Sequence, residues 1–134
     1  MAREIRDRVM VVDGEPLIRW ALCTALSAAG FDAVGAEDAA AALRLAGEWP
    51  PPRVAVIDWG PAKRTADLVT EISRIYPYCR LVLMTTTDRR DLVAPQSWDP
   101  VVVDKPFDLA RVVALVRDVV AGRVCVPLDR RKGA

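Results

Sequence analysis

Near its amino terminus the chain reads Val9-Met10-Val11-Val12-Asp13-Gly14-Glu15-Pro16, an apolar run that ends at a carboxylate and then turns. Consecutive apolar, mostly β-branched residues closed by an Asp-Gly pair predict a strand buried on both faces, as in the centre of a parallel sheet. Pro16 suits the first turn of a helix, because its missing N–H would have no partner there. Asp13 is therefore expected at the carboxyl end of a central strand, where open α/β sheets bind their ligands.

The pattern of a buried strand followed by a helix recurs along the chain. Further apolar runs predict strands at 31–36, 54–58, 81–84 and 101–103. Helical spacing predicts helices at 16–29, 37–48 and 63–76, and a last helix that Asp108 caps and that buries Leu109, Val112, Val116 and Val119. Strands alternating with helices predict an α/β fold, a single-domain, doubly wound, five-stranded parallel sheet. Pro95 and Pro100 leave room for only about two turns of helix between them, so the fourth helix is expected to be shortened.

Length and composition place the chain among single-domain globular proteins. Its 134 residues suffice for one core, and we assign 1–122 to the domain and 123–134 to a short basic tail. No apolar run approaches the roughly 20 residues that span a bilayer, and the first residues lack the apolar core of a signal peptide, so a cytoplasmic location is expected. With 19 basic and 18 acidic residues, the chain has no large net charge that would attract it to nucleic acid or to a membrane surface.

Two residue types narrow the chemistry further. The three cysteines form no C-x-x-C pair and are odd in number, which indicates reduced thiols rather than a disulfide framework. The chain contains no histidine. Imidazole metal ligands, a Ser-His or Cys-His nucleophile pair and a phosphohistidine relay within this chain are thereby excluded.

Polar residues follow four of the predicted strands: Asp13, Asp58, Thr86 and Lys105. Because the carboxyl ends of parallel strands share one edge of the sheet, these groups are expected to converge. Two carboxylates suit Mg²⁺, which usually binds one or two of them and keeps its waters for phosphate oxygens. Lys105 offers a positive charge and Thr86 a hydroxyl donor to an anion. An aspartate in such a site can act as the nucleophile toward a phosphoryl group.

Four segments carry a family resemblance that spans roughly residues 8–122: Val11 to Pro16, Val56-Ile57-Asp58, Leu83 to Thr86, and Asp104-Lys105-Pro106-Phe107. They resemble the receiver domain of bacterial two-component response regulators. The resemblance implies a flavodoxin-like (βα)₅ receiver fold with strand order 2-1-3-4-5.

The resemblance also implies roles for individual residues. Asp58 would be the phosphoacceptor, Thr86 the switch hydroxyl and Lys105 the phosphate-binding ammonium. Mg²⁺ would be held by Asp13, Asp58 and the backbone carbonyl of Gly60. The phosphoryl group would come from an external sensor histidine kinase or histidine phosphotransfer protein, and a downstream protein would receive the signal.

The sequence departs from the family pattern in the metal and phosphate pocket. Gly14 stands where family members usually have a second acid that binds the metal directly, although Glu15 could reach back toward the site. The loop Trp59-Gly60-Pro61 is one residue shorter than usual. Val102 occupies a position that is usually aromatic, and Thr87 one that is usually Ala or Gly. Losing a metal ligand should weaken Mg²⁺ binding by at least 10–100-fold, the order of magnitude seen for lost supporting residues.

Three functions are compatible with these observations. The first is a receiver domain of a two-component phosphorelay that accepts a phosphoryl group on Asp58 and is not itself an enzyme. The second is a pseudo-receiver, a phosphorylation-independent protein-interaction module, which Gly14 favours. The third is a small hydrolase or phosphatase using Asp58, for which no general acid is evident. No direct contact with nucleic acid is expected, while a homodimer through the final helix and a longer parent protein stay open.

Overall fold

In the computed structural model, the structure describes residues 6–45, 50–59, 63–85, 101–105 and 108–122. The side chains of 63–66 and 68 are likewise not described. The expected short fourth helix, within 88–100, and the basic tail from residue 123 lie outside the described residues.

Five parallel strands form one sheet in the order β2-β1-β3-β4-β5, which confirms the predicted doubly wound topology. Their bounds are β1 Arg8–Val12, β2 Asp32–Ala36, β3 Val54–Asp58, β4 Arg80–Thr85 and β5 Val101–Asp104. β1 pairs with both β2 and β3, so the opening apolar run is a central strand as predicted. The switch in strand order beside β1 creates the kind of edge where open α/β sheets bind ligands.

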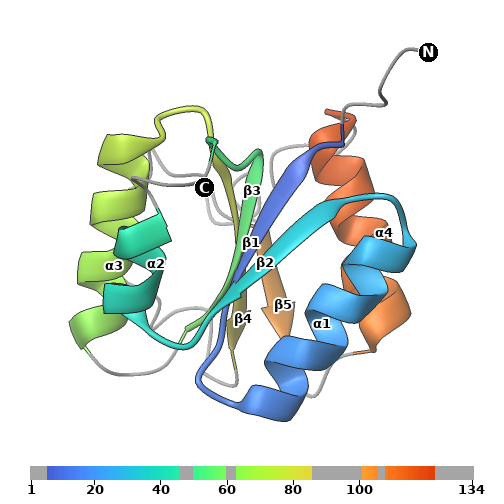
Figure 1. Ribbon diagram of the computed structural model, residues 1–134, viewed down its shortest axis with the longest axis horizontal. Helices are drawn as coiled ribbons and strands as arrows, with labels where there is room; N and C mark the ends of the chain where they lie inside the picture. The colour runs from blue at the N-terminus through green and yellow to red at the C-terminus, as the bar shows by residue number, and fades with distance from the viewer. Residues whose placement is uncertain (1–5, 46–49, 60–62, 86–100, 106–107, 123–134) are drawn as a thin grey trace, which may run out of the picture.

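Helices cover both faces of the sheet (Figure 1). α1 (Pro16–Ala28) and α4 (Leu109–Val120) pack on one face, whereas α2 (Ala39–Leu45) and α3 (Lys63–Ile75) lie on the other. Asp38 accepts a hydrogen bond from the N–H of Ala41 at 2.8 Å, so α2 begins slightly later than the predicted residue 37. None of the helices in the described segments is long and apolar enough to cross a bilayer.

The sheet separates two apolar clusters, and β1 supplies both because its side chains alternate between the faces. Val9 and Val11 join Leu22 and Leu26 of α1 and the buried valines of α4. On the other face, Met10 and Val12 pack with residues of α2 and α3. Every one of these β1 side chains is at most 5% exposed, which explains why the strand is uniformly apolar.

The end of α1 and the start of α4 agree with the predicted stop and cap residues, whereas one predicted core residue of α4 does not. α1 stops before Gly30, whose φ of 101° is accessible mainly to glycine. The Asp108 carboxylate accepts a hydrogen bond from Ala110 N–H at 2.9 Å and so caps α4. Leu109, predicted to face inward, is 37% exposed, because as the first residue of α4 it precedes the inward-facing stripe that begins at Val112.

Candidate functional site

The carboxyl ends of the strands bring three of the predicted site residues to one edge of the sheet. Asp13 directly follows β1, Asp58 ends β3, and Lys105 directly follows β5. β1 and β3 are neighbours, so the two carboxylates lie on adjacent strands. Only β4 separates β3 from β5. Thr86 and Gly60, also predicted for this site, lie outside the described residues.

The ammonium of Lys105 binds the carboxylate of Asp58 directly, through Nζ and Oδ1. The backbone positions Lys105 for this contact, because its N–H donates to the carbonyl of Thr85 at 2.8 Å and extends the β4–β5 ladder by one residue. From there the long lysine side chain reaches across the end of β4. The two side chains remain 22% and 34% exposed, so both stay accessible to a ligand arriving from solvent.

Asp13 is the buried carboxylate of the site, at 1% exposure. Its Oδ1 accepts a hydrogen bond from Glu15 N–H at 2.9 Å, while its Oδ2 is buried and has no hydrogen-bond partner among the residues that the structure describes. Burial raises the pKa of Asp13 and the negative charge of Asp58 raises it further, against the opposing effects of the Glu15 N–H and the Lys105 ammonium. Within the described segments, Oδ2 is thus an acceptor without the partner that a buried oxygen normally has.

The residues flanking Asp58 and the end of β4 are tightly held. Trp59 donates its backbone N–H to the carbonyl of Met84 at 2.8 Å. Its side chain is 7% exposed and belongs to the apolar cluster beside α3. Thr85, the last residue of β4, is fully buried, and no sequence argument singled it out. Asp58 therefore lies at a strand end that is held in place by backbone hydrogen bonding and burial of its neighbours.

The loop between β1 and α1 lacks the expected second acid. Gly14 is exposed, and a Cβ built there would lie 3.7 Å from the carbonyl oxygen of Glu37, an ordinary contact. Space is therefore not the reason for glycine at this position. Glu15 precedes α1 in an extended conformation, and its exposed side chain makes no hydrogen bond that caps the helix. Its carboxylate acts on Asp13 through its charge, which raises the Asp13 pKa slightly.

These residues fit a magnesium ion with a reduced set of protein ligands. In the described parts of the chain, no three Asp, Glu or Cys side chains are grouped closely enough to hold a metal ion. Asp13 and Asp58 nevertheless supply two carboxylates, and the unpartnered Oδ2 of Asp13 is a ready oxygen ligand. Two carboxylates and one ammonium leave a net negative charge, which favours a cation. Mg²⁺ commonly binds to one or two carboxylates and completes its shell with water.

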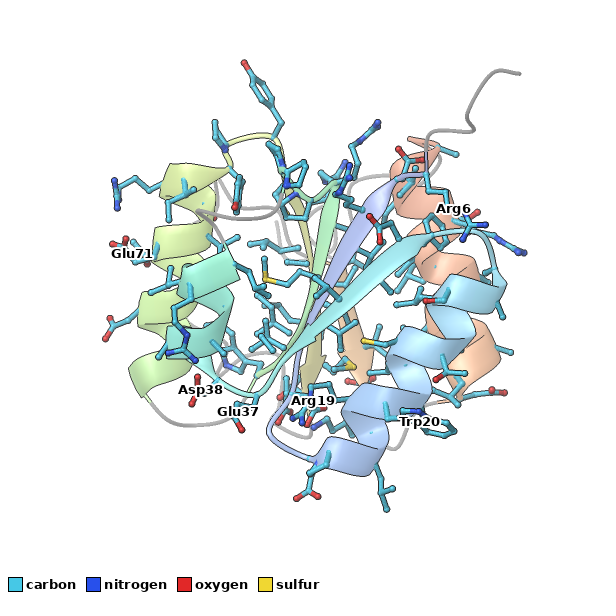
Figure 2. All side chains as sticks on the ribbon, viewed as in Figure 1. Arg6, Arg19, Trp20, Glu37, Asp38 and Glu71 are labelled. Carbon is cyan, nitrogen blue, oxygen red and sulfur yellow. The ribbon has the colours of Figure 1, made fainter. Side chains whose placement is uncertain are left out.

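Arg19 also contacts the site, although no sequence pattern predicted this contact. Its Nη1 donates to the backbone carbonyl of Asp13 at 2.8 Å. Figure 2 shows Arg19 at the lower edge of the sheet, at the same end as Glu37 and Asp38. A single charged residue on the polar part of a helix carries no recognisable signal, because the contact depends on how α1 lies against β2.

The chain is similar in structure to response regulators. It superimposes with a TM-score of 0.74 on a response regulator from Thermotoga maritima, at 19% identity over 87% of this chain and 99% of that one. The chemotaxis response regulator CheY4 of Vibrio cholerae gives 0.74 at 20% identity, over 86% and 99%. The response regulator TrrA of Thermotoga maritima, in complex with Mg²⁺-BeF, gives 0.69 at 26% identity, over 84% and 98%.

Comparison of sequences alone does not detect this similarity. No protein-family model matches the chain, and no curated protein matches it at a significant level. The predicted receiver fold is confirmed at the level of structure.

Proposed function

We propose that this chain, which has the fold of the response-regulator receiver domains and fits a divergent member of them, accepts a phosphoryl group on Asp58. The observation that carries the proposal is the direct contact of the Lys105 ammonium with the Asp58 carboxylate, beside the buried and partly unpartnered Asp13. A carboxylate nucleophile, a cation for the phosphoryl oxygens and acceptors for a divalent metal are the parts that this transfer needs.

The transfer would form an acyl phosphate. An oxygen of Asp58 forms a bond to phosphorus, while the bond from phosphorus to the imidazole nitrogen of the donor breaks and the imidazole keeps that electron pair. The donor histidine belongs to another protein, since this chain has no histidine. Lys105 then exchanges its contact with Asp58 for one with a phosphoryl oxygen. Asp13 and Asp58 would hold Mg²⁺, which neutralises charge on the transferring group when bound.

A second candidate function rests on Gly14. Without a side-chain oxygen at this exposed position, the site offers one carboxylate fewer than the family pattern. A protein that no longer needs to hold Mg²⁺ tightly could use the same fold as a phosphorylation-independent interaction module. Both functions use a receiver fold, and they differ in whether the edge of the sheet binds metal and phosphoryl analogue.

The test is a Mg²⁺ titration followed by addition of beryllofluoride, read by tryptophan fluorescence and by calorimetry. Trp59 adjoins Asp58 and should report on the site, whereas Trp20 is 67% exposed on α1. Trp59→Phe identifies the origin of the signal. Saturable binding of Mg²⁺, with a further change on addition of beryllofluoride, would support phosphoryl acceptance. As the control, Asp58→Asn should abolish the change on beryllofluoride. A folded protein without either response would favour the interaction module.

A further inference from the structure

Arg19 holds the backbone of the loop that carries Asp13. It lies in the first turns of α1, where its own N–H donates to the carbonyl of Glu15 at 2.9 Å, as in a regular helix. Its guanidinium reaches back to the carbonyl of Asp13. Asp13 is then fastened at three points, because its N–H also donates to the carbonyl of Ala36 at 3.1 Å and its Oδ1 accepts from Glu15. Of the polar atoms of Asp13, Oδ2 alone finds no partner in the described part of the chain.

The path of the Arg19 side chain depends on Gly35 of β2. A Cβ at residue 35 would lie 2.8 Å from Cγ of Arg19, which is closer than such carbon atoms approach, and at a tight 3.0 Å from its Cδ. These atoms belong to the stem of the side chain and not to its flexible end. The backbone of Gly35 has no left-handed conformation that would require glycine. Glycine is needed here for close approach alone.

We infer that Arg19 is a positioning residue for the metal site, and that Gly35 provides the space in which it works. By holding the Asp13 carbonyl, Arg19 fixes the direction in which the Asp13 carboxylate points, so that Oδ2 is presented to the ligand. The inference rests on the proposed function. Supporting residues of this kind typically account for about 10–100-fold in metal affinity.

The first measurement is the Mg²⁺ affinity of variants by calorimetry. We expect Arg19→Ala to weaken binding by about 10-fold or more, with Arg117→Ala, an exposed residue of α4, as the control that leaves it unchanged. Gly35→Ala should weaken binding in the same direction by pushing the Arg19 stem aside. The double variant should bind like Arg19→Ala alone, because the clashing Cγ is then absent. The remaining contact, with Sγ of Cys23 at 3.3 Å, is one that a small shift relieves.

The second measurement needs no metal. In the wild-type protein the Glu15 amide is bonded to Asp13 Oδ1, so its hydrogen exchange reports on the position of that carboxylate. Exchange at Glu15 should accelerate in Arg19→Ala and in Gly35→Ala, while amides in α4 keep their rates. Absence of Mg²⁺ binding by the wild-type protein would refute the proposed function and leave this readout intact. Unchanged exchange at Glu15, or additive effects in the double variant, would overturn the role of Arg19.

Discussion

Lys105 and Asp58 are bound to each other across the end of an intervening strand. Asp58 ends β3 and Lys105 follows β5, and β4 lies between these two strands. The ion pair therefore spans the carboxyl end of β4. The pair fixes the Asp58 side chain in the metal-free protein and neutralises one of the two carboxylates. Under the proposed function, a phosphoryl group on Asp58 would take over the contact with Lys105 and so connect Asp58 to β5.

Replacing Asp58 by Asn should abolish phosphoryl acceptance without destabilising the fold. The change removes one negative charge from the vicinity of buried Asp13, so the free energy of unfolding should stay the same or rise. The measurement is intact-mass analysis after incubation with a phosphodonor, combined with urea denaturation. Asp67→Asn, at an exposed position of α3, is the matched control and should label like the wild-type protein. Labelling that survives in Asp58→Asn would show that another residue is the acceptor.

Introducing an acid at residue 14 should restore metal affinity. Gly14→Asp places a carboxylate next to Asp13, and a Cβ at this exposed position would meet the Glu37 carbonyl only at an ordinary contact distance of 3.7 Å. We expect Mg²⁺ to bind at least about 10-fold more tightly, as measured by calorimetry. Gly14→Ala supplies the Cβ without the carboxylate and should bind like the wild-type protein. Equal affinities for Gly14→Asp and Gly14→Ala would mean that residue 14 does not face the metal.

Asp13 should make the stability of the metal-free protein fall as the pH rises. Burial raises its pKa in the folded state above the ordinary value of 3.8, so the folded protein keeps this proton to a higher pH than the unfolded chain does. The associated stabilisation is complete below pH 3.8 and is lost as the pH rises through the folded pKa. Asp13→Asn removes this loss and keeps an oxygen for the Glu15 N–H.

The corresponding measurement is urea denaturation of metal-free protein between about pH 4 and pH 8, a range that covers the ionisation of a carboxyl with a raised pKa. At neutral pH, Asp13→Asn should be more stable than the wild-type protein, and the difference should shrink as the pH is lowered. Asp67→Asn is again the control. A difference that is independent of pH would contradict the assignment of this titration to Asp13.

Removing the side chain that precedes α4 should destabilise the protein more than removing the side chain that precedes α1. Asp108→Ala removes the hydrogen bond to Ala110 N–H and should cost about 1 kcal/mol of unfolding free energy. Glu15→Ala removes a side chain that makes no capping bond to α1, so its effect should be clearly smaller. Thermal and urea denaturation of both variants give the comparison. A loss at Glu15 as large as that at Asp108 would show that Glu15 has another structural partner.

The strands were predictable because their signals are local and redundant, whereas their order was implied by the resemblance to receiver domains. Val9 to Val12 and Val54 to Ile57 are apolar at every position, which only a strand with cover on both faces accounts for. The meeting of Asp13, Asp58 and Lys105 followed from their common position at strand ends. Leu109 was mistaken for a core residue, because spacing along a helix does not tell where the helix begins to touch the sheet.

The contact between Arg19 and the Asp13 carbonyl could not be predicted in this way. It depends on how α1 lies against β2, and on the missing side chain at Gly35, which the sequence shows only as a weak strand position. Arg19 itself looks like any polar residue on the outer part of a helix. Tertiary packing determines such contacts, and no periodic pattern in the sequence predicts them.

The separation of the two apolar clusters by the sheet has a consequence for how this protein can change over evolutionary time. Stability resides in side chains above and below the sheet, while the acidic groups lie at its rim, and Asp13 in its ionised form opposes folding. Substitutions of exposed residues at the rim, such as Gly14, therefore leave both apolar clusters undisturbed. A lineage can lose an acid such as the one absent at Gly14, keep its architecture intact, and regain or abandon the chemistry later.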